Sequence, residues 1–133
     1  MYINFKLNNI NFINFLIEID NIVLKLLVNN FKKWFNIEKD YFSVLEYLIP
    51  SVIENEKNNN EENDEDENIF ILNVPLNKKN IDVDFYNDKK ELINFTNNNI
   101  KINTSRNIIK LNGIILDKER CYCSWELIQS QLI

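Results

Sequence analysis

Apolar residues recur every three or four positions between Phe12 and Phe35, which is the spacing of one face of an α-helix. Asp20 lies inside this stretch, and its short carboxylate suits a helix N-cap because it can accept hydrogen bonds from the first turn. The pattern therefore predicts a helix from Asn21 to Phe35 with one buried face. The apolar positions are Phe12, Leu16, Ile19, Val23, Leu26, Leu27, Phe31, Trp34 and Phe35.

The segment ahead of this helix, residues 2–19, fits two structures equally well. Ile3, Phe5 and Leu7 alternate with polar residues ahead of two asparagines, which is typical of a β-hairpin. The three-and-four spacing that starts at Phe12 is equally compatible with a helix. Helix and strand both remain open for this segment.

A second helical pattern begins at Asp40. Pro50 lacks an amide hydrogen and clashes with the preceding turn, so this helix should kink or end near Ile49. The apolar positions of the pattern are Phe42, Leu45, Leu48, Ile49, Val52 and Ile53.

Trp34 and Phe35 stand beside two lysines at the end of the first helix, an arrangement that could anchor a partner protein. The same residues also fit the interior of the protein. We expect Phe35 in the core and Trp34 packed against the second helix.

The hydrophobic period changes to two after residue 69. The alternating runs recur about every ten residues, and the Asn, Asp and Lys clusters between them suit turns because Asn and Asp tolerate positive φ. We therefore expect an antiparallel meander. The alternating apolar positions are Phe70, Leu72, Val74 and Leu76, then Ile81, Val83 and Phe85, then Ile93 and Phe95, and then Ile100 and Ile102. The turn clusters are Asn77 to Asn80, Asn87 to Lys90 and Asn97 to Asn99.

The pair Asn112 and Gly113 is the strongest local turn signal, because both central residues of a type I′ turn need positive φ. It lies between two apolar runs and predicts a tight hairpin. A last strand should follow from Arg120 to Trp125, and the tail Glu126 to Ile133 should form one or two helical turns.

An acidic tract runs from Glu54 to Asn68. It holds eight carboxylates and one lysine, with no apolar residue, whereas the whole chain has a net charge of −5. Such a segment cannot offset its ordering entropy, so it should be a disordered linker. It could also screen a basic face or dock on a basic partner, but it lacks the glycine that a calcium loop requires.

The fold class that follows is α+β, with a helical half over residues 1–53 in which an N-terminal β-hairpin is still open. A disordered acidic linker covers residues 54–68, and an antiparallel β-meander covers residues 69–133. A chain of 133 residues suits one domain overall.

Composition limits what residue identity can say. The chain has no alanine or histidine, one glycine, 26 asparagines and 21 isoleucines, a skew typical of an AT-rich genome. Without histidine, the common catalytic triads, histidine metal ligands and near-neutral titrating groups are excluded. With a single glycine, the usual phosphate-binding loops are also excluded. We expect no enzyme, no catalytic residue and no cofactor.

Two small clusters contain side chains that can bind metal ions. Asp82 and Asp84 could bridge a cation from one strand face, but alternating acids are the ordinary solvent face of a strand. Cys121 and Cys123 are too few for structural zinc, and their spacing strains a disulfide. We expect both thiols to act as small apolar side chains that point inward, on the same strand face as Trp125. We expect no metal site.

The apolar stretch from Phe12 to Val28 is interrupted by charged and amide side chains, so it does not resemble a membrane span. The N-terminal residues resemble neither a secretory signal nor a transit peptide. With no disulfide framework either, we expect a cytoplasmic, reducing compartment, although an organelle interior stays open.

The function expected by elimination is a non-catalytic accessory subunit or adaptor that binds protein partners in a larger assembly. The alternative is a single-stranded nucleic-acid-binding or polymerase-associated factor of an AT-rich replicon or organelle. It depends on aromatic and basic residues interleaved in the meander, among them Lys89, Lys90, Arg106 and Lys110. Nucleic acid is the weaker expectation because residues 69–133 carry seven acids against nine bases.

Overall fold

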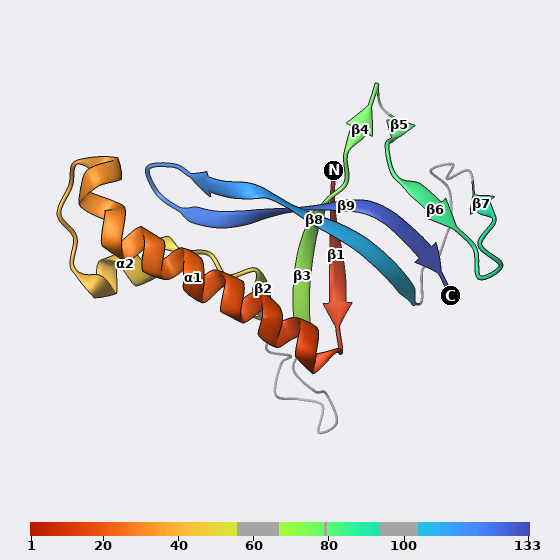
Figure 1. Cartoon of the computed structure of the whole chain (residues 1–133), viewed down its shortest axis with the longest axis horizontal. Coiled ribbons are helices and arrows are strands. Elements are labelled where there is room, and N and C mark those ends of the chain that lie inside the picture. Colours follow the sequence, from red (N-terminus) through yellow and green to blue (C-terminus); the bar gives the residue numbers. More distant parts are fainter. Residues whose placement is uncertain (56–66, 79, 94–103) are drawn as a thin grey trace. The chain divides into compact units, whose positions relative to one another are not determined.

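The computed structural model describes residues 1–55, 67–78, 80–93 and 104–133 (Figure 1). Within them the chain has the predicted α+β class, with two N-terminal helices, a mixed seven-stranded sheet and a separate two-stranded sheet. The chain divides into two compact units that are discontinuous in sequence. Unit 1 comprises residues 1–3, 72–112 and 124–133, and unit 2 comprises residues 4–71 and 113–123.

The elements follow one another in the order strand, two helices and eight strands. They are β1 (Tyr2–Leu7), α1 (Ile10–Phe35), α2 (Tyr41–Tyr47), β2 (Val52–Asn55), β3 (Glu67–Asn73), β4 (Leu76–Asn77), β5 (Asn80–Ile81), β6 (Asp84–Tyr86), β7 (Leu92–Ile93), β8 (Ser105–Leu116) and β9 (Cys121–Leu132).

Helix α1 begins at Ile10 rather than at Asn21. Asn9 caps it, with an extended backbone and a side-chain oxygen that accepts from the amides of Asn11 at 3.0 Å and Phe12 at 3.2 Å. The helix continues through Asp20, so the prediction that Asp20 is an N-cap is wrong. The strand over Tyr2–Leu7 is confirmed, whereas a hairpin over the whole segment to residue 19 is wrong.

The buried stripe of α1 differs from the predicted one. It follows a regular spacing of three and four residues, but it includes the charged residue Asp20 and excludes Leu26 and Trp34, which are 44% and 45% exposed. Because α1 is apolar around much of its circumference, spacing alone could not select the core face. The buried residues are Ile13, Leu16, Asp20, Val23, Leu27 and Phe31.

Helix α2 forms as the sequence predicts and ends slightly earlier. Asp40 caps it by accepting from the Ser43 amide at 2.8 Å, and the chain is extended again from Leu48, ahead of Pro50. The prediction that Val52 continues this helix is wrong, since it lies in β2. An aromatic cluster joins the two helices, in which the Tyr47 ring lies 5.5 Å from the rings of both Phe31 and Phe35.

The acidic tract connects two paired strands. β2 and β3 are antiparallel, with Val52 opposite Phe70 and Asn55 opposite Glu67. Residues 54, 55, 67 and 68 are therefore strand residues, and the predicted linker boundaries were too wide. The Glu67 carboxylate also forms an ion pair with Lys6 at 2.6 Å. The disorder predicted for residues 56–66 concerns a segment that lies outside the described residues.

The sheet is mixed, so the prediction of a purely antiparallel meander is wrong. β9 is central, and it pairs in parallel with β3 at Asn73 and Glu126 and with β6 at Phe85 and Ser130. The strand order is β1-β3-β9-β6-β7, with β2 beside β3 and β8 beside β9. The long β9 pairs with β3 and β6, which are distant in sequence, as well as with the preceding strand β8.

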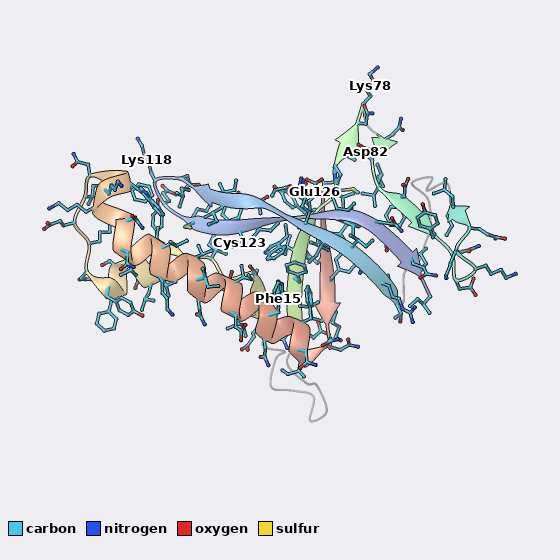
Figure 2. All side chains as sticks on the ribbon, viewed as in Figure 1. Phe15, Lys78, Asp82, Lys118, Cys123 and Glu126 are labelled. Atoms are coloured by element: carbon cyan, nitrogen blue, oxygen red, sulfur yellow. The ribbon has the colours of Figure 1, made fainter. Side chains whose placement is uncertain are left out.

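The short hairpins of unit 1 confirm two of the predicted turns. β4 and β5 pair antiparallel around Lys78, which has a positive φ, and Figure 2 shows Lys78 at the tip of this hairpin. β6 and β7 pair around the Asn87–Lys90 turn, in which the Lys90 amide donates to the Asn87 carbonyl at 3.0 Å. The runs predicted at Phe95 and at residues 100–102 lie outside the described residues.

The turn between β8 and β9 is not at Asn112 and Gly113, so that prediction is wrong. Both residues lie inside β8, and the chain reverses at Asp117 to Arg120. The Asp117 carboxylate accepts from the amides of Glu119 at 2.8 Å and Arg120 at 2.9 Å, and Figure 2 shows Lys118 at this reversal. A turn at this point allows two twelve-residue strands to pair.

Three further details of this hairpin bear on the predictions. Gly113 has a φ of 159°, close to extended backbone, so it is part of the strand rather than a tight turn. The Asn112 amide donates to the Glu126 carboxylate of β9. The helical tail predicted for Glu126 to Ile133 is also wrong, since β9 continues to Leu132.

The cap of α1 can be tested by replacing its side chain. Asn9→Ala should lower the free energy of unfolding by about 1 kcal/mol, because two amides of the first turn lose their acceptor. The matched control is Asn14→Ala on an exposed position of the same helix, where alanine should stabilise by a few tenths of a kcal/mol. Urea unfolding of both variants provides the comparison. Equal stabilities of the two variants would contradict the cap.

Candidate functional site

The most concentrated set of polar and potentially reactive side chains lies inside unit 2. Asp20 is only 7% exposed, yet it is in the middle of α1 on its buried stripe. Its carboxylate accepts from the Ser51 amide and from the Ser51 hydroxyl, each at 2.7 Å. Such charge-assisted hydrogen bonds replace the water that the carboxylate loses on burial.

Two thiols of β9 complete this cluster. Cys121 is fully buried and Cys123 is 8% exposed, and neither forms a disulfide. The Cys121 carbonyl accepts from the Ile49 amide at 2.8 Å, which ties β9 to the segment that carries Ser51. Figure 2 shows Cys123 on β9. The prediction that both cysteines and Trp125 share the inward face is confirmed by their burial.

The surroundings of the thiols suppress their reactivity. Burial, and then the nearby Asp20 carboxylate, raises the pKa of Cys121 from 9.0 to about 11. The pKa of Cys123 is raised to about 11 by burial, by the charge of Asp20 and by its hydrogen bond to that carboxylate. Nucleophilic attack and metal binding both need the thiolate, so this environment opposes both. The arrangement is that of a structural polar cluster.

Tyr47 is a second buried polar group in unit 2. Its hydroxyl has no hydrogen-bond partner within the described part of the chain, and the residue is 5% exposed. Burial, followed by the charge of Asp117, raises the pKa of this phenol. A phenol held in its neutral form by its surroundings is a poor general base, so Tyr47 contributes its ring rather than its hydroxyl.

The acidic pair Asp82 and Asp84 is solvent exposed. Asp82 lies between β5 and β6, where its amide donates to the Pro75 carbonyl at 2.8 Å, and Asp84 begins β6. Figure 2 shows Asp82 beside β5. Over the described ranges, no three Cys, Asp or Glu side chains are grouped closely enough to hold a metal ion.

The four cations of the nucleic-acid alternative are exposed and belong to unit 1. Lys89 and Lys90 are in the turn between β6 and β7, and Arg106 and Lys110 are on β8. None of them forms an ion pair with another described residue. The cations come from two separate elements. Nothing in their positions tests nucleic-acid binding, which stays a prediction.

A group of large apolar side chains is exposed where α1 gives way to α2. Trp34, Ile37, Tyr41 and Phe42 are 45%, 53%, 54% and 76% exposed, and we call them the α1–α2 corner. The Phe35 ring contacts α2 through Tyr47, and Trp34 is 45% exposed. The packing of Trp34 against the second helix stays a prediction, and Phe35, which we expected in the core, is half-buried.

The backbone of this corner is fixed at both ends. Asn36 adopts a left-handed conformation, with a φ of 55°, and its amide donates to the Lys32 carbonyl at 2.8 Å. Asp40 then caps α2. The hydrogen bond that the Ser43 amide donates to the Asp40 carboxylate holds the pKa of Asp40 below its usual value. Lys32 and Glu38 form an ion pair at 2.7 Å across the connection.

Sequence reasoning missed the Asp20 cluster because Asp20 and Ser51 are 31 residues apart. One signal could have found it. Leu16, Asp20 and Leu27 share one helical face, and a carboxylate among apolar positions on a buried face needs a partner from another element. The exposed corner had no such signal, because exposure of aromatic residues depends on tertiary packing.

No protein-family model matches the chain, and no curated protein or solved structure is detectably similar to it. Among the described helices, none combines the length and apolar character needed to cross a membrane.

The thiols provide a direct test of the cluster. At pH 8 a pKa of about 11 leaves roughly one thiol in a thousand ionised, so labelling of the native protein by a disulfide reagent should be at least about 100-fold slower than labelling in guanidinium chloride.

Because folding raises these pKa values, the free energy of unfolding should also fall as the pH rises from about 9 to about 11.

The matched control for this test is Lys118→Cys at the exposed β8–β9 turn, whose added thiol should be labelled at the rate of a free peptide thiol. If Cys121 or Cys123 of the native protein were labelled as fast as this added thiol, the structural assignment of the cluster would be wrong.

Proposed function

We propose that the protein is a non-catalytic accessory subunit or adaptor that binds another protein through the α1–α2 corner. The observation that carries the proposal is the exposure of Trp34, Tyr41 and Phe42 within one short connection. Large aromatic side chains contribute most of the binding energy at protein interfaces when a partner covers them.

The helix caps on both sides of the corner support the same role. The left-handed Asn36 and the capping Asp40 fix the chain direction on both sides of Ile37. A preorganised surface loses less conformational entropy when it binds than a mobile one does. The Tyr41 and Phe42 rings contact each other at 6.0 Å, so they present a joined apolar surface.

The chemistry of the chain favours binding over catalysis. The sequence contains no histidine, and its single glycine rules out the usual phosphate-binding loops. The polar groups that burial brings together in unit 2, Asp20, Ser51 and Cys123, are occupied with one another. A binding role uses the exposed surface and requires none of these groups to react.

The proposal predicts that a partner protein co-purifies with the tagged chain from its native cell, and that Phe42→Ser strongly reduces its recovery. Phe42 is 76% exposed, so the substitution removes contact area without opening a cavity. The measurement is quantitative mass spectrometry of the co-purified chains.

The matched control for partner capture is Ile10→Ser, which removes a 64% exposed apolar side chain at the opposite end of α1. Recovery of the partner should be unchanged by this control. Equal recovery with wild type, Ile10→Ser and Phe42→Ser would contradict binding through the corner, and absence of any co-purifying chain would contradict the accessory role.

A further inference from the structure

Helix α1 carries a second apolar stripe that is solvent exposed. Phe15, Ile19, Ile22 and Leu26 are spaced by four, three and four residues, which is the seam spacing of a coiled coil. Phe15, Ile22 and Leu26 are 47%, 56% and 44% exposed, and Ile19 is half-buried. We call these four residues the α1 seam. Three successive exposed turns of this kind are what a second helix covers.

The seam is separate from the buried stripe but is supported from beneath. The Phe15 ring stacks on Phe12 with ring centres 6.3 Å apart, and Phe12 contacts the edge of the buried Phe70 at 5.8 Å. Figure 2 shows Phe15 on α1. This aromatic series fixes one end of the seam against the core of unit 2, so the seam is preorganised for packing.

Two charges flank the seam on the same side. Glu18 and Lys25 are seven residues apart, so each occupies the equivalent position of its heptad, directly before Ile19 and Leu26 respectively. Both are exposed, and neither forms an ion pair with any other residue in the described part of the chain. Their separation along the helix, about 10 Å, is too large for them to pair with each other.

We propose that the α1 seam binds the α1 seam of a second copy of this chain, in an antiparallel, two-fold symmetric pair. Ile19 then lies opposite Ile22 of the second copy, and Phe15 lies opposite Leu26 of the second copy. In this register the flanking positions meet as well, so Glu18 faces Lys25 of the second copy. The two-fold axis produces that ion pair twice.

The charges select this arrangement over its close alternatives. Shifting the antiparallel register by one heptad places Glu18 opposite Glu18 of the second copy, or Lys25 opposite Lys25, and like charges repel. In a parallel pair, Glu18 would instead face Val23 of the second copy, and Lys25 would face Asn30, so neither charge would meet an opposite one. Charge complementarity therefore favours a second copy, bound antiparallel.

The expected dimer is weak. Four seam residues per helix cover about 16 Å of the length of α1. A contact of that length buries an area at the lower end of specific interfaces. The ion pairs lie at the rim, where each changes affinity by only a few fold and is screened by salt. The seam residues supply the affinity, and the flanking charges determine the register.

The test is sedimentation of the full chain at low and high salt, over concentrations from about 1 to 500 µM. At low salt the wild type should form a dimer, and Ile22→Asp should be monomeric at every salt concentration. Glu18→Lys alone and Lys25→Glu alone should each weaken the dimer about tenfold, because two symmetric contacts change from attraction to repulsion. Near 1 M salt these two effects should largely disappear.

The double charge reversal, Glu18→Lys with Lys25→Glu, is the matched control. It restores opposite charges across the pair and should recover wild-type affinity, while circular dichroism verifies that every variant is folded. A wild type that stays monomeric throughout the range would overturn the proposal. So would a dimer that survives Ile22→Asp, or one in which the double reversal fails to rescue the single reversals.

This inference does not depend on the proposed accessory role. The seam and the α1–α2 corner share no residue, so Phe42→Ser should leave the dimer intact and Ile22→Asp should leave partner capture intact. Failure of one therefore leaves the other standing.

Discussion

A buried carboxylate in the middle of a long helix is the constraint on which unit 2 depends. Asp20 is on the core stripe of α1, where Ser51 donates to its carboxylate from both its amide and its hydroxyl, and the Cys123 thiol bonds to it as well. An unpaired buried charge would cost several kcal/mol. The segment that follows α2 must therefore return to the centre of α1 for the helix to be buried on that face.

The same constraint determines where β9 runs within unit 2. Cys121 bonds to the chain next to Ser51 through its carbonyl, and Cys123 reaches the Asp20 carboxylate through its thiol. These polar groups thus join one helix, one connection and one strand. The described helices also carry two exposed apolar regions, the α1–α2 corner and the α1 seam.

The sequence predicted correctly the start of the second helix and two turns, which depend on residues close together in the chain. The second helix begins after Asp40, whose side chain bonds to nearby backbone, and the turns with positive φ at Lys78 and Lys90 lie in the predicted turn clusters. The Asn112 and Gly113 signal failed because extending β8 to Leu116 pairs far more strand than a turn at Gly113 would allow. The parallel pairing of β9 joins residues that are distant in sequence, and no spacing rule encodes it. For the candidate site, the inward thiols followed from strand alternation, whereas the Asp20 cluster and the exposed Trp34 depended on tertiary packing.

The most direct test of the central constraint is a double-mutant cycle of Asp20→Ala and Ser51→Ala, measured by urea unfolding. Each single variant removes the bond between the Ser51 hydroxyl and the Asp20 carboxylate, so the two losses should not add, and we expect a coupling energy of at least about 1 kcal/mol. Losses that add within about 0.3 kcal/mol would show that Asp20 and Ser51 act independently, and would contradict this account of the fold.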